Sequence, residues 1–225
     1  MRKSIYPTGI LVAALFCMST PRSYAQSLPF QNEIEAFKHQ DSIQPPPQHA
    51  ILFTGSSSFQ KWKDIAAYFP DYTVINRGFG GSSLPDVIRY AKDIIFPYHP
   101  RQIVIYCGDN DLAGSGTVTA KTVYTRFRTL YSLIRSHDKT VSILYVSIKP
   151  SPSRAALMPK MAQANKLIGR FLAKQKNAGF VDVYHLMLDP AGQPIDDLFV
   201  GDKLHMNAKG YAIWQKAIRP YFIKE

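Results

Sequence analysis

The chain has 225 residues, of which 46% are hydrophobic and 12% aromatic. This length allows one domain with a substantial core, and the composition excludes a disordered chain. The formal net charge of +11 would suit an anionic partner, but Lys and Arg are scattered along the chain, which favours a solvated basic surface. No basic stripe or recognition motif indicates a nucleic-acid partner.

The first 25 residues have the pattern of a secretory signal peptide. Arg2 and Lys3 form a positive start, and an apolar run over residues 9–18 follows. Residues 23–25 then supply the small side chains of a cleavage site, so Gln26 is the expected new N-terminus. The apolar run is too short to span a bilayer, so we expect a secreted or periplasmic protein without stable membrane insertion.

Removal of the signal peptide changes both the charge and the cysteine content. It removes three basic residues and no acidic ones, so the net charge falls from +11 to +8. Only Cys107 remains of the two cysteines, which excludes an internal disulfide in the mature chain. With one cysteine and no histidine pair at metal-ligand spacing, we expect no metal site.

The mature chain divides into a lead-in at residues 26–48 and one domain at residues 49–225. In the lead-in, residues 30–37 predict a short amphipathic helix. The three prolines at 45–47 predict an extended approach to the first strand.

Beyond the lead-in, strand-like and helical patterns alternate. The expected strands cover residues 50–53, 73–75, 102–107, 141–146 and 180–184, and the expected helices lie at about 57–69, 83–95, 120–136, 157–177 and 207–222. The first, third and fourth strands are nearly continuous in apolar residues, as is typical when helices cover both faces of a sheet. The alternation predicts an α/β fold with a doubly wound parallel sheet.

Glycine and polar residues collect in four segments beside the expected sheet. Three segments follow strands and one precedes the last helix; they are residues 55–58, 76–83, 108–111 and 202–205. Because the carboxyl ends of parallel strands lie on one edge of the sheet, these segments can converge. Ester hydrolysis needs a nucleophile, an oriented base and donors for the developing oxyanion, and each segment can supply one of these parts.

The last segment offers a base. Asp202 lies three residues before His205, so its carboxylate could accept from one imidazole nitrogen while the other takes a proton from a serine. An Asp-x-x-His pattern is common by chance, and His205 could instead begin the last helix. His185, after the fifth expected strand, is the main competitor.

The second and third segments offer hydrogen-bond donors. Gly80 and Gly81 could bring backbone N–H groups close to a reacting centre, although a plain turn explains them equally well. The Asn110 side chain can donate without titrating, but capping is the commoner role for such an Asn.

Taken together, these four segments resemble the blocks of the SGNH/GDSL hydrolases, a family of esterases, lipases and carbohydrate deacetylases. Residues 55–57 look like the family's Gly-Asp-Ser block, and the other segments look like its glycine, Gly-x-Asn-Asp and Asp-x-x-His blocks, in that order. The resemblance covers about residues 51–214. It implies a flavodoxin-like three-layer α/β/α sandwich with a five-stranded parallel sheet, and no cofactor.

The resemblance also implies a role for each matching residue. Ser57 would be the nucleophile, His205 the general base and acid, and Asp202 the residue that orients the imidazole. The oxyanion hole would consist of the backbone N–H groups of Ser57 and Gly81 and the side-chain amide of Asn110.

Two of these assignments have close alternatives. Gly78 and Gly80 compete with Gly81, and Ser56 and Ser58 compete with the middle serine. Ser56 also departs from the family, which usually has Asp at this position. That Asp is not the triad acid, so the departure affects the hydrogen bonding of the turn rather than the chemistry.

A further segment at residues 147–154 follows the fourth strand and lies on the same edge, where it could line the substrate pocket. Its Arg154 could bind an anionic group, although a solvated loop arginine is the commoner case. Cys107 ends the third strand and is expected to be a buried apolar residue.

The sequence therefore predicts a secreted serine esterase. It would hydrolyse carboxylic esters with short acyl groups, including O-acetyl groups on carbohydrates, through an acyl-enzyme on Ser57. Alternatives are a lysophospholipase, an acyltransferase or a catalytically idle carbohydrate-binding protein on the same fold. The expected partner is a small-molecule or carbohydrate ester, and nothing in the sequence indicates an oligomeric state.

Overall fold

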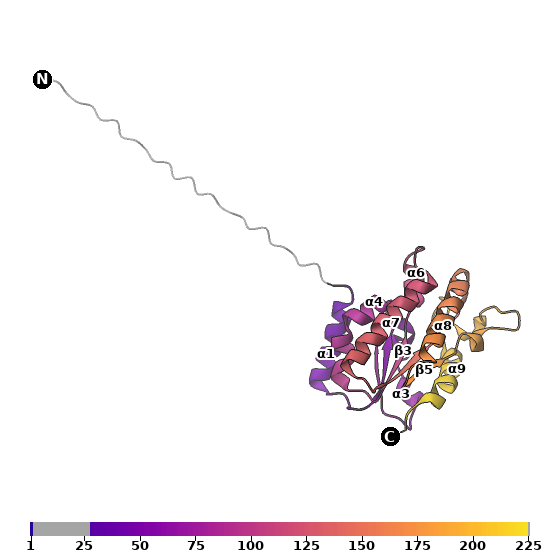
Figure 1. The fold of residues 1–225 in the computed structure, drawn as a ribbon, viewed down its shortest axis with the longest axis horizontal. Coiled ribbons are helices and arrows are strands. Elements are labelled where there is room, and N and C mark those ends of the chain that lie inside the picture. The colour runs from indigo at the N-terminus through magenta and orange to yellow at the C-terminus, as the bar shows by residue number, and fades with distance from the viewer. Residues whose placement is uncertain (2–27, 225) are drawn as a thin grey trace.

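The computed structural model describes Met1 and residues 28–224 (Figure 1). The expected cleavage site and Gln26 lie outside the described residues. Within them, five strands form one parallel sheet in the order β2-β1-β3-β4-β5. This is the flavodoxin-like order of a doubly wound sheet, so the predicted fold class is confirmed. The strands are β1 (Ile51–Gly55), β2 (Val74–Gly78), β3 (Gln102–Tyr106), β4 (Ser142–Val146) and β5 (Ala178–Val181).

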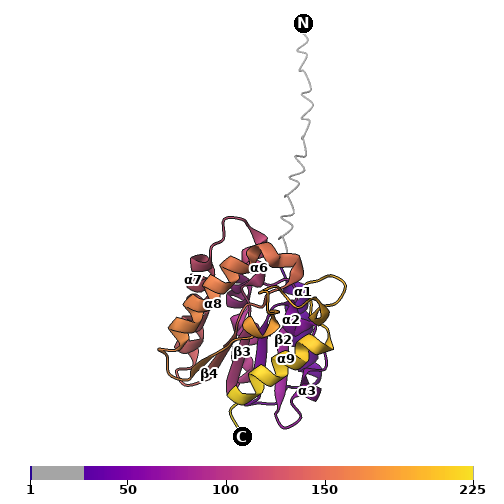
Figure 2. The same ribbon diagram turned by 90° about the vertical axis from the view of Figure 1, so that its right-hand side faces the viewer.

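Helices cover both faces of this sheet, which gives three layers (Figure 2). One face packs against α1 (Gln31–Ile43), α4 (Leu84–Arg89), α5 (Ala91–Ile94), α7 (Ala120–His137) and α8 (Met158–Leu172). The other face packs against α2 (Ser57–Gln60), α3 (Ile65–Tyr68) and α9 (Ala208–Ile218). A short helix, α6 (Asp109–Gly114), follows β3 at the carboxyl edge.

Successive side chains of the central strands enter different cores. In β1, Leu52 belongs to the core under α7 and α8, whereas Ile51 and Phe53 belong to the core under α2, α3 and α9. The same alternation occurs in β3 and β4. Because both faces are buried, apolar residues occupy consecutive positions, and this explains the uninterrupted runs in the sequence.

The lead-in forms a longer helix than expected, since α1 covers residues 31–43 rather than 30–37. Ile34 is 1% exposed within the core, and the Phe30 ring packs edge-on against Phe79 with centroids 5.3 Å apart. The last turn has few apolar residues and was therefore not recognised from its pattern. It contributes Asp41, which pairs with Arg77 of β2.

The second strand is also longer than expected, because residues 76–78 belong to β2 and not to a loop. The Asn76 side chain donates to the Phe59 carbonyl at 2.7 Å. Arg77 is buried, and its Nε donates to the Tyr98 hydroxyl at 2.7 Å. Both polar residues have partners distant in sequence, so no local pattern marks them as part of a strand.

The fifth strand lies earlier than expected, at residues 178–181 instead of 180–184. After Val181 the chain leaves the sheet, and the backbone N–H groups of Val183 and Tyr184 each donate to Ser147 Oγ at 2.9 Å. The Ser147 side chain thus replaces the neighbouring strand as the hydrogen-bond partner of this backbone. The alternation of apolar residues nevertheless continues to residue 184, and it predicts a longer strand than the one that forms.

Two expected helices are interrupted. The first divides into α2 and α3, and the Trp62 carbonyl between them accepts from the Asn76 amide at 3.3 Å. The second divides into α4 and α5 at Tyr90, whose hydroxyl donates to the Pro29 carbonyl at 2.7 Å. The helix expected at 157–177 ends at Leu172, and the last helix ends at Ile218.

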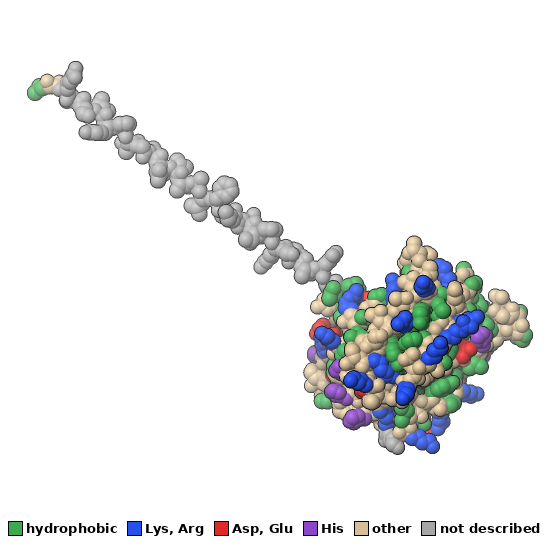
Figure 3. Space-filling view, viewed as in Figure 1, with side chains coloured by type: hydrophobic (Ala, Val, Ile, Leu, Met, Phe, Trp, Pro, Cys, Tyr) green, Lys and Arg blue, Asp and Glu red, His purple; other side chains and the backbone are tan. Residues whose placement is uncertain are grey.

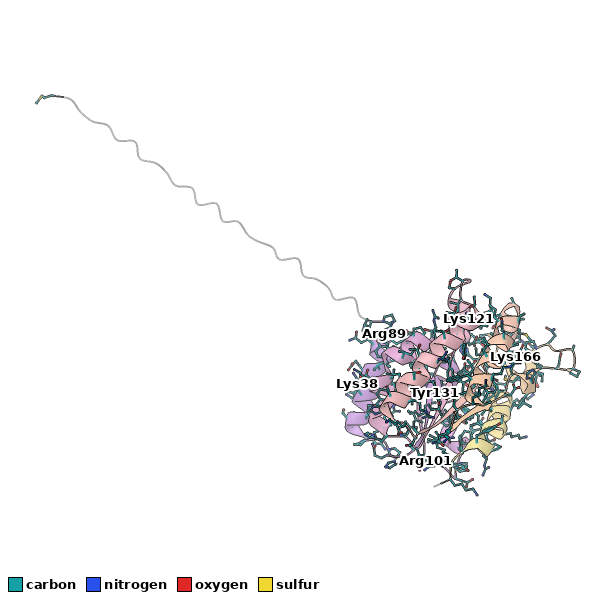
Figure 4. The ribbon with its side chains drawn as sticks, viewed as in Figure 1. Lys38, Arg89, Arg101, Lys121, Tyr131 and Lys166 are labelled. Carbon is teal, nitrogen blue, oxygen red and sulfur yellow. The ribbon has the colours of Figure 1, made fainter. Side chains whose placement is uncertain are left out.

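Basic side chains are spread over the visible face rather than gathered in one patch (Figure 3). Lys38, Lys121 and Lys166 illustrate this, because they lie on the separate helices α1, α7 and α8 (Figure 4). Within the described residues, no helix combines the length and apolar character needed to span a membrane.

The Asp41–Arg77 pair makes α1 an integral part of the domain, and this can be tested by substitution. Asp41→Ala leaves the Arg77 guanidinium, with 8% of its side chain exposed, without its carboxylate partner. Removing one partner of a buried pair is strongly destabilising, so we expect the free energy of unfolding to fall by about 3 kcal/mol. Urea denaturation measures this change.

A matched control lies on the same helix. Glu35 pairs with Lys38 at 3.1 Å, but both side chains are largely exposed. We expect Glu35→Ala to change stability by less than about 0.5 kcal/mol. Equal effects of the two substitutions would show that α1 is held by general helix propensity and not by the buried pair.

Candidate active site

A close backbone contact determines where the serine segment lies. Gly55 ends β1 with a φ of 130°, and a Cβ built on it would lie 1.9 Å from the Tyr106 carbonyl oxygen. Only glycine fits both this conformation and this contact. The next residue, Ser56, donates its backbone N–H to the same Tyr106 oxygen at 3.0 Å. The chain therefore turns over the end of β3 and starts α2 at Ser57.

Of the three consecutive serines, the structure brings one to a histidine. Ser56 and Ser58 are each only 2% exposed, and the Ser56 carbonyl accepts from the N–H groups of the following helical turn. Ser57 is partly exposed, and its Oγ lies 2.9 Å from Nε2 of His205. Ser57 is thus the serine with an adjacent base.

The imidazole is held from its other side by a carboxylate. Nδ1 of His205 lies 2.6 Å from Oδ2 of Asp202, while Oδ1 accepts the backbone N–H groups of Leu204 and His205 at 2.9 Å each. Partial burial acts to raise the pKa of Asp202, but the hydrogen bonds from the imidazole and the two N–H groups outweigh it. The pKa of Asp202 therefore lies well below its ordinary value, and the carboxylate stays ionised.

The competing histidine has a similar carboxylate but no serine. Nδ1 of His185 lies 2.6 Å from Asp182 Oδ2, and its backbone N–H donates to the same side chain at 3.2 Å. The His185 side chain is 75% exposed, and in the described part of the chain no serine hydroxyl bonds its ring. Asp182 and His185 thus form a second Asp-x-x-His pattern, whose spacing alone does not distinguish it from that of Asp202 and His205.

Three donors lie in the segments expected to form an oxyanion hole. Among the described residues, the backbone N–H groups of Ser57 and Gly81 have no hydrogen-bond acceptor. The Gly78 N–H already donates to Asn76 Oδ1 at 2.9 Å, which removes it as an alternative, whereas Gly80 remains one. Asn110, in the first turn of α6, donates from Nδ2 to the Ser82 carbonyl at 3.0 Å and keeps its second amide hydrogen.

A charged cluster lies directly behind Asn110. Nη2 of Arg154 donates to Asn110 Oδ1 at 3.0 Å, and Nη1 lies 2.5 Å from the carboxylate of Asp109. Arg154 has only 17% of its side chain exposed. The interpretation of Arg154 as a solvated loop residue is therefore wrong, because a buried carboxylate from another segment holds it.

The cluster includes a lysine that sequence analysis did not single out. Lys149 is 1% exposed, and its Nζ lies 3.5 Å from Asp109 Oδ2. Burial lowers the pKa of Lys149, although the Asp109 carboxylate opposes the shift. A lysine between apolar residues near a strand end gives no local signal of burial, since lysine is almost always exposed.

Cys107 is fully buried, as expected, and burial raises the pKa of its thiol. Across the described residues, no group of three or more His, Cys, Asp or Glu side chains could hold a metal ion.

The low pKa of Asp202 can be measured by following its carboxyl carbon by NMR during an acid titration. We expect a midpoint below the ordinary value of about 3.9. The pKa of Asp202 is lower in the folded state than in the unfolded state. Its contribution to stability is therefore complete above the unfolded-state pKa and is lost as the pH falls through the folded-state pKa. In His205→Ala the midpoint should move upward, because the imidazole no longer donates. A wild-type midpoint at or above the ordinary value would contradict this assignment.

Comparison with known proteins adds a family to this geometry. Residues 45–213 match the model of the GDSL-like lipase/acylhydrolase family. A comparison with curated proteins found no significant match.

Several solved structures share the fold. A protein from Streptococcus pneumonia, provisionally described as a platelet activating factor, is 20% identical with a TM-score of 0.74, over 84% of this chain and 91% of that chain. A GDSL-like lipase from Bacteroides thetaiotaomicron is 18% identical with a TM-score of 0.69, over 84% and 96%. A family 3 carbohydrate esterase from Talaromyces cellulolyticus is 17% identical with a TM-score of 0.60, over 76% and 94%. At these identities the likeness to the solved structures concerns the fold alone. The family match covers most of the chain, and it shows that the protein belongs to the GDSL-like lipase/acylhydrolase family.

Proposed function

We propose that this protein is a serine esterase that cleaves carboxylic esters through an acyl-enzyme on Ser57. The observation that carries the proposal is the 2.9 Å contact between Ser57 Oγ and His205 Nε2, with Asp202 on the opposite ring nitrogen. A serine hydroxyl is a weak nucleophile until a neighbouring base removes its proton, and this arrangement supplies that base.

In the first half of the reaction, Oγ of Ser57 attacks the ester carbonyl carbon while Nε2 of His205 takes the hydroxyl proton. Asp202 keeps Nδ1 protonated and stabilises the imidazolium that forms. The carbonyl oxygen becomes an oxyanion, for which the N–H groups of Ser57 and Gly81 and the amide of Asn110 are the proposed donors. The intermediate then expels the alcohol, which receives its proton from His205.

In the second half, water attacks the acyl group on Ser57. His205 removes a proton from this water, and the same donors stabilise the second oxyanion. Collapse of the intermediate breaks the bond from the acyl carbon to Oγ and returns a proton to Ser57. The products are a carboxylic acid, an alcohol and the unchanged enzyme.

A short acyl group, such as an O-acetyl group on a carbohydrate, is the proposed substrate. The Phe30 ring lies beside Gly81, one of the proposed oxyanion donors, because a Cβ built on Gly81 would meet Phe30 Cε1 at 3.8 Å. This ring limits the room on that side of the site. A carbohydrate esterase among the structures with this fold also supports the proposal.

The esterase proposal predicts a sharp difference between two histidine variants. With p-nitrophenyl acetate, Ser57→Ala and His205→Ala should each lower kcat by about 10⁴-fold or more, since each removes a triad member. His185→Ala is the matched control, because it has the same carboxylate contact but no serine, and its kcat should stay within about twofold. Equal losses in the two histidine variants would overturn the assignment of the base.

Assays with p-nitrophenyl esters of increasing acyl length distinguish the proposed esterase from the three alternative functions. Turnover should fall as the acyl chain lengthens, whereas a lysophospholipase would favour long chains. An acyltransferase would form a new ester when an alcohol acceptor is added, and an idle carbohydrate-binding protein would turn over no ester. Any of these three results would replace the proposed substrate class or reaction.

We also propose that residues 1–25 direct export of the protein and are then removed. Expression of the full chain in a bacterial host should yield a product outside the cytoplasm that begins at Gln26, as measured by mass spectrometry of the N-terminal peptide. Ala25→Arg places a bulky charge at the cleavage site and should block processing. A cytoplasmic product that retains the leader would contradict the proposal.

A further inference from the structure

The amide of Asn110 is fixed at both of its ends. Its Nδ2 donates to the Ser82 carbonyl at 3.0 Å, and its Oδ1 accepts from Arg154 Nη2 at 3.0 Å. A carbonyl can only accept and a guanidinium can only donate, so these partners permit one orientation of the amide and exclude the flipped one. That orientation leaves one N–H of Asn110 for an oxyanion.

The guanidinium of Arg154 is itself held in place. Nη1 lies 2.5 Å from the Asp109 carboxylate, which is 6% exposed. Lys149 contacts the same carboxylate at 3.5 Å, and the Tyr106 hydroxyl donates to it at 3.3 Å. The Arg154 guanidinium therefore places a positive charge next to Asn110, where a negative charge would develop.

The backbone around Arg154 is anchored on two sides. The Asn165 side chain bonds both the N–H and the carbonyl of Ile148, at 2.8 and 2.9 Å. The N–H of Ser153 donates to the Lys203 carbonyl at 3.1 Å, within the segment that holds Asp202 and His205. Arg154 is therefore fixed relative to both the amide donor and the base.

We propose that Arg154 is a positioning residue for the oxyanion hole, which orients the Asn110 amide and adds positive charge behind it. This inference rests on the proposed esterase function. It predicts that Arg154 acts on the transition state through Asn110 and not on substrate binding, so that its loss lowers kcat and leaves KM nearly unchanged.

Kinetics of Arg154→Ala on p-nitrophenyl acetate test this prediction. We expect kcat to fall by about 10- to 100-fold, less than the loss of an oxyanion donor, with KM within about twofold. Added guanidinium chloride, at a concentration too low to denature the protein, should restore part of kcat because it can occupy the vacated site. Arg154→Lys should restore less than the free guanidinium, since an ammonium lacks the planar fork.

A matched control and a double variant test whether Arg154 affects kcat through Asn110. Arg126 pairs with Asp111 of the same helix α6 at 2.8 Å, and among the described residues no hydrogen bond joins it to Asn110, so Arg126→Ala should leave kcat within about twofold. In an Asn110→Ala background, Arg154→Ala should have little further effect. An unreduced effect in that background, a large rise in KM, or an equal loss in Arg126→Ala would each overturn the proposal.

A second readout does not depend on turnover. The side-chain amide signals of Asn110, assigned by their disappearance in Asn110→Ala, should shift or broaden in Arg154→Ala and recover with guanidinium. If the wild type hydrolyses no ester, the proposed function fails, but these signals still decide whether Arg154 orients the amide. Unchanged signals in Arg154→Ala would overturn the inference even if the enzyme is an active esterase.

Discussion

The contact between Gly55 and the end of β3 determines the positions of the other groups at this edge. The Gly55 carbonyl accepts the N–H of Phe79 at 2.9 Å and the hydroxyl of Ser82 at 3.1 Å, so it also ties the glycine segment to β1. A side chain at position 55 would push β1 away from Tyr106 and separate these segments. Because position 55 is a glycine, the segments that follow β1, β2 and β3 can approach one another.

Asp202 and Asp109 both lie at this edge of the sheet, but they differ in exposure and in the groups that they contact. Asp202 has 44% of its side chain exposed and is kept ionised by hydrogen bonds, so it can hold one tautomer of His205. Asp109 is buried and is balanced by two bases. A buried carboxylate without a cationic partner would be strongly destabilising, so the contacts with Lys149 and Arg154 offset the cost of burying Asp109 beside the site.

The histidine segment depends on a cap rather than on the sheet. Asn207 Oδ1 accepts the N–H groups of Lys209 and Gly210 at 2.9 and 3.3 Å, and this cap starts α9 at Ala208, three residues after His205. The Asn207 amide also donates to the Asp197 carbonyl at 2.8 Å and so anchors the segment to the preceding loop. These contacts place His205 against Ser57, although 148 positions separate the two residues.

Much of the fold followed from the sequence because burial on both faces leaves a local signal. The central strands β1, β3 and β4 were recognised from their apolar runs, whereas the edge strands β2 and β5 were misplaced. In β2 the polar residue Arg77 pairs with the distant Asp41, and after β5 the backbone donates to the distant Ser147 side chain. Local sequence patterns do not record such pairs. For the same reason the convergence of Ser57 and His205 could be expected from parallel topology, but the burial of Lys149 and Arg154 could not.

The serine at position 56 is consistent with how this turn is built. Its backbone N–H bonds Tyr106 and its carbonyl accepts from Phe59 and Gln60, while its side chain caps nothing. At 2% exposure, a carboxylate here would need hydrogen-bond donors to offset the cost of its desolvation. A small hydroxyl avoids that cost. In this chain Asp109 is a buried carboxylate of this edge, and it forms ion pairs with Lys149 and Arg154. Arg154 in turn donates to Asn110 and so links the two residues.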